Sequence, residues 1–486
     1  MSERATFLKH TAIYGLGGLL LQAAGVVLLP LYTRRLAQAD FGILEIINRT
    51  GEVLIVLLMA RGLSGAAFTF YCQAGNRVEK ARVAATVFLA AWVIIVCALI
   101  LTWLCARPLS TILAIDDERL LMLGMAATLS QLLPALPMTF MQARMQSIAF
   151  VCASMTVVVL RVSFVVTLVA GLKWGIWGVL WGTLLSSLLA GAVLTAIEFR
   201  SGEFRPDWGK LVAVLRFAWP FIPNGLFGFV LFSGDRYFLL KAVGPKEVGV
   251  YALAAKLADL VSLVAFAPLF KVWSAWLYRV YAQSDGDRAV GRAFTWLLLP
   301  YISLGAAVCI FRREITLLLG TDEYIGASSI LVPLIVARGL LAAQVLMDGA
   351  FYVYQRTTLK LAPTVIAAMA VVCFQLVMVP QYGCFGAAVA AVAAYFLYAF
   401  TTYLFSQQVF FVKCEYGRMA AVLTATVLLV WLSYAIPDGA RNIPIKAATC
   451  AVWPVLLWTV GVISEQERVW IISGARRAGA WMRGVS

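Results

Sequence analysis

The sequence predicts an all-α integral membrane protein with about 14 transmembrane helices. Of its 486 residues, 62% are apolar and only 13% are charged, against roughly 45–50% and about 25% in soluble domains. Apolar segments of about 20 residues, enough to cross a hydrocarbon core of about 30 Å, alternate with short polar breaks almost from end to end. The breaks leave no room for a soluble domain.

Charged and Gly- or Pro-rich stretches mark the ends of the expected spans. The first span follows Arg4 and Lys9. It exceeds the apolar core of a signal peptide, about 7–15 residues, and is interpreted as an uncleaved helix. Spans 43–71 and 326–354 are long enough that they must tilt or extend beyond the bilayer. The expected spans are 11–32, 43–71, 83–105, 120–141, 148–170, 177–198, 217–240, 250–272, 293–311, 326–354, 362–380, 385–405, 419–436 and 445–463.

The basic residues of the polar breaks predict the orientation. With the N-terminus inside, the cytoplasmic breaks hold 21 Lys and Arg residues and the external breaks hold 11. The positive-inside rule therefore predicts a multi-pass protein of the cell inner membrane with both termini in the cytoplasm. These residues are spread over many breaks and form no continuous stripe, so the net charge of +15 does not indicate a nucleic-acid partner.

Seven cations fall inside the expected spans and form the predicted substrate-binding set. A charged side chain at the bilayer centre costs roughly 2.5–3.5 kcal/mol, so it normally faces a water-filled cavity or a partner. A cavity with a positive surplus suits phosphate or pyrophosphate, which Arg binds with a bidentate fork and Lys as a point charge. The alternative is that these cations pair within the bundle or extend to the headgroups. The seven are Arg49, Arg61, Arg161, Arg236, Lys256, Lys271 and Arg338.

Five carboxylates share the spans with them: Glu45, Glu52, Asp235, Asp259 and Asp348. The last four are assigned to charge balance or to ion coupling, and a proton carrier among them would need a pKa raised by burial. The i to i+3 spacing predicts that Arg49 pairs with Glu52 and Lys256 with Asp259. Asp235 and Arg236 are adjacent and are expected to point in different directions, so that they do not satisfy each other.

An internal repeat predicts two lobes. A shift of 207 positions matches basic with basic, glycine with glycine and acidic with acidic residues, although four matches over one helix pair can also arise by chance. An even number of spans separates the copies, which predicts parallel repeats about an axis along the membrane normal. The expected divisions are a six-helix lobe at 1–212, a second at 213–412, and two added helices with a tail at 413–486. The matched pairs are Arg34 with Lys241, Gly42 with Gly249, Arg49 with Lys256, and Glu52 with Asp259.

No catalytic constellation is present, so the chain is not expected to be an enzyme or to need a cofactor or metal. The one histidine, His10, precedes the first span, which excludes a Ser/His/Asp triad and a His-based zinc site as the main chemistry. Gly15–Gly18 begins like a dinucleotide loop, but Leu20 stands at the third glycine position. The nine cysteines form no C-x-x-C pair and no metal-ligand spacing.

Four short motifs, in this order and spacing, resemble the polysaccharide transporter family, which includes the Wzx-type O-antigen and exopolysaccharide flippases. The resemblance is strongest over residues 8–75 and 215–275. One departure is His10-Thr11, where the family often has Asn-Thr or Asn-Ser. The motifs are Thr33-Arg34-Arg35-Leu36 followed by Asp40-Phe41-Gly42, then Trp219-Pro220-Phe221-Ile222-Pro223, Gly234-Asp235-Arg236-Tyr237-Phe238-Leu239, and Val248-Gly249-Val250-Tyr251.

The resemblance implies a two-lobed bundle around a central cavity, within a superfamily that also holds multidrug exporters and the lipid II flippase. It implies alternating access and a polyprenyl-pyrophosphate-linked glycan as substrate, with membrane lipids, a polysaccharide polymerase and export proteins as further partners. A lipid II flippase remains an alternative, as does a multidrug exporter, although an exporter of organic cations is expected to show an acidic surplus. A membrane-embedded glycan polymerase would need a large external loop, and none is present.

Overall fold

The computed structural model describes residues 17–18, 21–22, 25–58, 60–200, 205–281, 283, 285–437 and 442–459, and over these residues it contains helices and no strand. The all-α prediction is therefore confirmed. The chain divides into two compact units. Unit 1 consists of residues 1–257, 316–334 and 361–398, and unit 2 consists of residues 258–315, 335–360 and 399–486.

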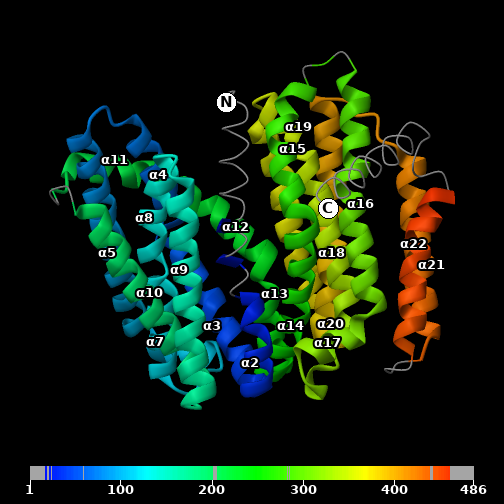
Figure 1. The fold of residues 1–486 in the computed structure, drawn as a ribbon, viewed down its shortest axis with the longest axis horizontal. Coiled ribbons are helices and arrows are strands. Elements are labelled where there is room, and N and C mark those ends of the chain that lie inside the picture. The colour runs from blue at the N-terminus through cyan, green and yellow to red at the C-terminus, as the bar shows by residue number, and fades with distance from the viewer. Residues whose placement is uncertain are drawn as a thin grey trace, which may run out of the picture. The chain divides into compact units, whose positions relative to one another are not determined.

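Unit 1 begins with a bundle of long apolar helices that pack side by side, α5, α7, α8, α9 and α10 (Figure 1). Polar side chains cap the starts of α5 and α7, because each accepts a hydrogen bond from a backbone N–H that the first turn leaves unpaired. Asn76 accepts from Glu79 at 2.8 Å, and Asp117 accepts from Arg119 at 2.8 Å. The first helices are α2 (Leu29–Arg35), α3 (Gln38–Leu57), α4 (Ala60–Gln73), α5 (Arg77–Leu104), α6 (Ala106–Ile112), α7 (Glu118–Ser130), α8 (Leu132–Ala143), α9 (Ser147–Val166), α10 (Gly175–Phe199) and α11 (Trp208–Ala218).

The helices that follow are interrupted at several points. Gly234 separates α12 from α13 although its backbone angles stay helical, and α20 contains Gly383 at φ +54°, a conformation that glycine adopts without strain. These helices are α12 (Phe221–Ser233), α13 (Asp235–Val243), α14 (Pro245–Val261), α15 (Ala267–Val280), α16 (Gly286–Ile310), α17 (Arg312–Leu319), α18 (Ala327–Met347), α19 (Gly349–Val353), α20 (Leu361–Val409), α21 (Tyr416–Ala435) and α22 (Ile443–Thr459).

Within unit 1, α3 and α14 cross with their backbones in contact at two glycines. A Cβ on Gly42 would overlap the carbonyl oxygen of Pro245 and lie 3.0 Å from the backbone nitrogen of Gly249. A Cβ on Gly249 would overlap the carbonyl oxygen of Gln38 and lie 3.2 Å from the backbone nitrogen of Gly42. Gly42 and Gly249 are partners in the 207-position repeat, as are Gln38 and Pro245. The contact is thus reciprocal, as two helices related by a two-fold axis would make it.

In unit 2, the last two described helices, α21 and α22, pack against α16. Polar groups fix the packing of α22, because Trp453 donates from its indole nitrogen to Ser303 Oγ at 2.9 Å. Lys446 is fully buried and its Nζ lies 2.7 Å from Glu314 Oε1. α22 is therefore held in unit 2 by an ion pair as well as by apolar contacts.

Most expected spans coincide with described helices. Within the described residues, 9 helices are long and apolar enough to cross a membrane, or 11 if two bent pairs are counted as single spans. The long span at 43–71 is one of these pairs, α3 and α4, bent by 47°. The other long span, 326–354, is interrupted at Asp348, between α18 and α19. Most of span 11–32 lies outside the described residues, so the count of 14 stays a prediction.

Candidate functional site

A buried carboxylate of α3 contacts three cations of unit 1. Glu45 is 2% exposed and receives cations from three helices. Arg49, one turn along α3, places Nη2 2.8 Å from Glu45 Oε1. Lys256 of α14 places Nζ 3.0 Å from Oε2, and Arg236 of α13 places Nε 3.7 Å from Oε1. Glu45 therefore ties α3 to both helices of the second repeat that carry these cations.

Two further carboxylates complete what we call the Glu45 cluster: Glu45, Arg49, Glu52, Asp235, Arg236 and Lys256. Glu52 accepts from Arg49 Nη1, with 3.1 Å to each oxygen. Asp235 accepts from Arg236 Nη1 at 2.6 Å. The cluster thus holds three cations and three carboxylates. Its balanced charge fits a buried site, where an uncompensated ion would be costly.

Neutral groups hold the cluster in place from two sides. The Tyr251 hydroxyl of α14 donates to Asp235 Oδ2 at 2.6 Å, and the guanidinium of Arg236 lies 5.4 Å from the centre of the Tyr251 ring. On α3, Thr50 and the hydroxyl of Tyr237 are 2.9 Å apart. The first link joins α14 to α13, and the second joins α3 to α13.

Two sequence expectations about pairing need correction. Asp235 and Arg236 do pair, because the carboxylate of Asp235, the first residue of α13, turns toward the next residue and accepts from both Arg236 N and Nη1. Lys256 binds Glu45, whereas Asp259 pairs with Arg338. The Arg49–Glu52 prediction is confirmed.

Glu45 is the functional candidate that the sequence prediction did not include in the site. Its signal was present, because positions 45, 49 and 52 fall on one face of a helix. The repeat shows why Glu45 was left out of the predicted site. Arg49 and Lys256 are repeat partners, but the partner of Glu45 is Ala252. A single carboxylate, present in only one copy of the repeat, therefore pairs with both equivalent cations. The sequence repeat by itself does not reveal this arrangement.

Unit 2 holds the remaining predicted carboxylates, and each has a cation. Arg338 Nε lies 2.6 Å from Asp259 Oδ1. Lys360 Nζ lies 2.6 Å from Asp348 Oδ2, and Gln344 donates to Asp348 Oδ1 at 2.9 Å. All four predicted charge-balance residues, Glu52, Asp235, Asp259 and Asp348, are thus paired. Lys271 lies exposed on α15.

Arg161 on α9 differs from Arg49, Arg236, Lys256 and Arg338, each of which pairs with a carboxylate. Its Nη1 donates to the neutral Gln131 Oε1 at 3.3 Å, and its Nε, like that of Arg236, is buried without a hydrogen-bond partner. Within the part of the chain that the structure describes, it has no carboxylate partner. It lines a cavity of about 370 Å³ with amide and hydroxyl side chains, including Gln142, Thr139 and Ser186. The side chain of Arg61, on α4, lies outside the described residues.

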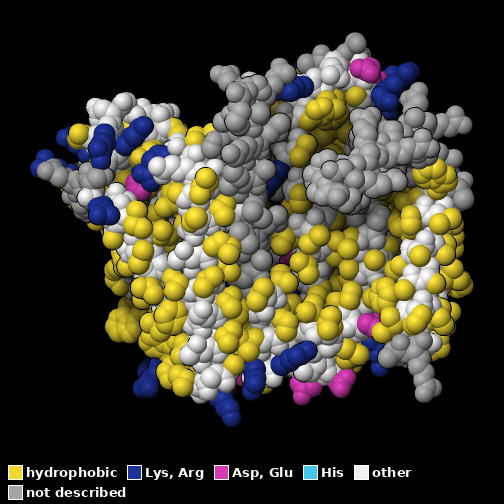
Figure 2. All heavy atoms as spheres, in the orientation of Figure 1, with side chains coloured by type: hydrophobic (Ala, Val, Ile, Leu, Met, Phe, Trp, Pro, Cys, Tyr) yellow, Lys and Arg dark blue, Asp and Glu magenta, His cyan; other side chains and the backbone are white. Residues whose placement is uncertain are grey.

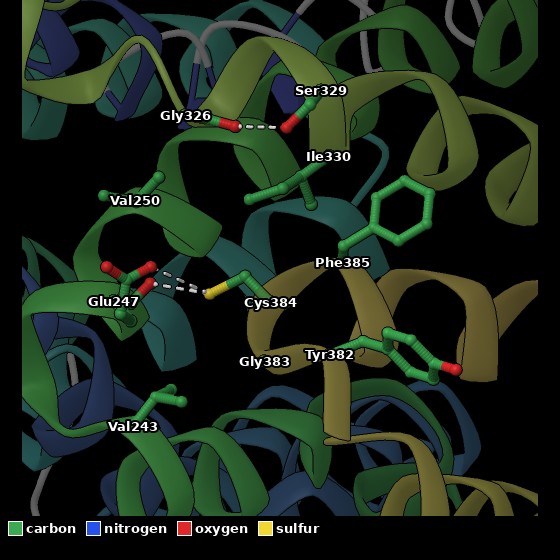
Figure 3. A pocket seen from close by; sticks show the side chains of 10 residues that line it. All are labelled: Val243, Glu247, Val250, Gly326, Ser329, Ile330, Tyr382, Gly383, Cys384 and Phe385. Carbon is green, nitrogen blue, oxygen red and sulfur yellow. Dashed lines mark hydrogen bonds between the residues drawn. The ribbon is translucent and has the colours of Figure 1, made fainter. Parts of the chain in front are cut away.

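A second cavity of unit 1, about 540 Å³ in volume, has a carboxylate and no cation among its described lining residues. Its ionisable lining groups are Glu247, Tyr382 and Cys384. Figure 3 shows the Cys384 thiol turned toward Glu247, where it donates to the backbone oxygen at 3.3 Å and to the carboxylate at 3.5 Å. A carboxylate without a lining cation disfavours an anion, so of these two cavities only the Arg161 cavity suits phosphate.

The chain is similar to known proteins both in sequence and in fold. A family model described as "Polysaccharide biosynthesis protein" matches residues 7–276. The chain is similar to the lipid II flippase MurJ in an inward closed conformation, with a TM-score of 0.74, 12% identity, and coverage of 94% of this chain and 98% of that one. It is also similar to an inward-facing multidrug resistance MATE transporter of the MOP superfamily, with a TM-score of 0.62, 14% identity, and coverage of 82% and 94%.

A third similar structure is a MOP superfamily transporter from Pyrococcus furiosus, reported as having reverse polarity of its binding pocket. Its TM-score is 0.56 and its identity 15%, with coverage of 83% of this chain and 95% of that one. No curated protein sequence matches the chain. At these identities the three structures establish the fold, and the family match is established by the sequence.

Proposed function

This chain belongs to the polysaccharide biosynthesis protein family, and we propose that it is a flippase for a polyprenyl-pyrophosphate-linked oligosaccharide repeat unit. It carries this unit across the inner membrane by alternating access, and the lobes at 1–212 and 213–412 are the moving parts. The product supplies a cell-surface polysaccharide, with a polymerase and export proteins acting next. Family and fold favour transport over catalysis.

The observation that carries the proposal is Arg161. An arginine inside a membrane helix normally faces a partner or a water-filled cavity. Arg161 lines a cavity and has a buried Nε with no acceptor, so its guanidinium can offer a fork to a phosphate. The neutral amides and hydroxyls around it can bind further oxygens without competing for the anion. A carrier of organic cations would need a carboxylate there, so a multidrug exporter is disfavoured.

The Glu45 cluster supplies the conformational part of the proposal. Its ion pairs bind α3 to α13 and α14, next to the crossing at Gly42 and Gly249. Separation of these helices would free Arg236 and Lys256 from Glu45 and expose cations where a phosphate could replace the carboxylate. Alternating access then exchanges one anion for another at little electrostatic cost, which is a feature that a carrier of pyrophosphate lipids requires.

We expect Arg161→Ala to abolish glycan export, because the lost fork cannot be replaced by the neutral groups of the cavity. Arg161→Lys should restore only part of the export, since an ammonium keeps the charge but not the fork. The measurement is surface glycan in cells that depend on this chain, with the variant quantified in the membrane fraction. Arg119→Ala, at an exposed site in the first turn of α7, is the matched control. Normal export by Arg161→Ala would show that the arginine is structural.

Both termini are proposed to be cytoplasmic, which is supported by the 21 to 11 distribution of basic residues. Reporter fusions after residues 76, 284 and 486 should report the cytoplasm, and fusions after 116 and 322 the periplasm. Positions 76 and 116 are separated by α5, whose 28 residues at about 1.5 Å each exceed the thickness of the hydrocarbon core. The reversed pattern would invert the direction of transport proposed above.

A further inference from the structure

A basic pocket lies at the end of unit 1 where α5 begins, and its lining shares no residue with the Glu45 cluster or the Arg161 cavity. Its volume is about 680 Å³. Figure 2 shows dark blue Lys and Arg side chains gathered at the upper left, where Figure 1 places the ends of α4, α5 and α11. The charged residues that line it are Arg77, Lys80, Arg82, Arg144, Arg205 and Glu198.

The single carboxylate among the described lining residues is used inside the wall. Arg144 donates from Nη1 and Nη2 to the two oxygens of Glu198, at 2.9 and 2.6 Å. The Tyr71 ring lies near two cations, with Lys80 Nζ 5.6 Å and Arg144 Cζ 5.8 Å from its centre. Because Glu198 is already paired with Arg144 in this wall, it does not neutralise Lys80 and Arg82, and the pocket keeps a positive surplus. Nearby Glu79 is bound by Lys210 at 2.7 Å.

The position of the pocket selects the kind of ligand. It opens beside the first turn of α5, whose N-terminal dipole also favours an anion. α5 is an apolar helix long enough to cross the bilayer, so its first turn lies at a membrane–water boundary. Phosphate groups of lipids lie at that depth, and arginine and lysine clusters at the membrane surface attract them.

We propose that this pocket binds the phosphate group of a membrane lipid. Two lipids can present that group: an anionic phospholipid of the bilayer, or a pyrophosphate-linked carrier lipid. The pocket is separate from the Arg161 cavity, and the inference does not rest on the proposed function. Its ligand would be held by Lys80 and Arg82 on α5, against the wall formed by Arg144 and Tyr71.

The test compares two double variants of equal charge. Lys80→Gln/Arg82→Gln removes two cations from the pocket, and Arg107→Gln/Arg119→Gln removes two from the other end of the same bundle. Native mass spectrometry of the purified full chain measures retention of phosphatidylglycerol and of phosphatidylcholine. A second measurement is the binding of inorganic pyrophosphate to the chain in phosphatidylcholine nanodiscs. Melting temperatures check that both double variants are folded.

We expect the pocket variant to lose at least about tenfold in affinity for a phosphate ligand, and the control to lose less than about twofold. If the pocket variant loses phosphatidylglycerol retention and the wild type binds no pyrophosphate, the bilayer lipid is the source of the phosphate group. Pyrophosphate binding that the pocket variant loses identifies the pyrophosphate group. The proposal is wrong if the two variants bind phosphatidylglycerol and pyrophosphate equally well, or if the wild type binds neither of these two ligands. The prediction for glycan export by the Arg161 variants does not depend on that result.

Discussion

Glu45→Gln is expected to destabilise the protein by about 3–5 kcal/mol, because it leaves the buried Arg236 and the half-buried Arg49 and Lys256 without the carboxylate that they share. The carboxylate is 2% exposed and holds Arg49, Arg236 and Lys256. Without it, three cations would share only Glu52 and Asp235, leaving a buried positive charge uncompensated. The measurement is unfolding in mixed micelles, followed by tryptophan fluorescence, together with surface glycan in cells.

The matched control is Glu52→Gln, on the same helix and bound to the same arginine. Glu52 is 36% exposed, so its loss should cost no more than about 1 kcal/mol. Adding Lys256→Gln to Glu45→Gln should recover part of the stability, because it removes one of the uncompensated cations. Equal effects of the Glu45 and Glu52 variants would contradict the central position of Glu45, as would a double variant that is less stable than Glu45→Gln.

Gly42→Ala and Gly249→Ala are each expected to destabilise the protein by about 1–3 kcal/mol, the usual cost of overpacking. Each new Cβ would overlap a carbonyl oxygen of the facing helix, and a backbone atom cannot move aside as a flexible side chain can. The helices α3 and α14 must therefore separate, which also lengthens the Lys256–Glu45 contact. Mixed-micelle unfolding measures the loss, and surface glycan measures its effect on transport.

Two further variants serve as controls for the glycine crossing. Gly417→Ala, on α21, places its Cβ where no atom lies within 4 Å, so it should be neutral or stabilise by up to about 1 kcal/mol. The Gly42→Ala/Gly249→Ala double variant should cost less than the sum of the single variants, because the first substitution already separates the helices. Fully additive costs would show that the two glycines act at independent sites.

The fold class, the position of most helices and the family could all be predicted from the amino-acid sequence. The reason is the solvent, because in lipid every backbone polar group must be satisfied within its own segment, so apolar stretches of sufficient length become helices. Spans 148–170 and 177–198 accordingly coincide with the membrane helices Ser147–Gly171 and Gly175–Phe199. The repeat at 207 positions is also a property of the sequence, and the reciprocal crossing of Gly42 and Gly249 gives it a structural meaning.

Which charges meet could be learned only from the packed helices. Spacing rules describe pairs within one helix, and they predicted Arg49 with Glu52 correctly. The partner of Lys256 depends on the close approach of α3 and α14, which brings Glu45 within 3.0 Å of a residue more than 200 positions away. Ion pairs between helices depend on how backbones pack, and packing depends on shapes summed over many residues. The sequence shows no acidic residue near Arg161 along its own helix, but whether another helix supplies a carboxylate could be learned only once the helices around it were in place.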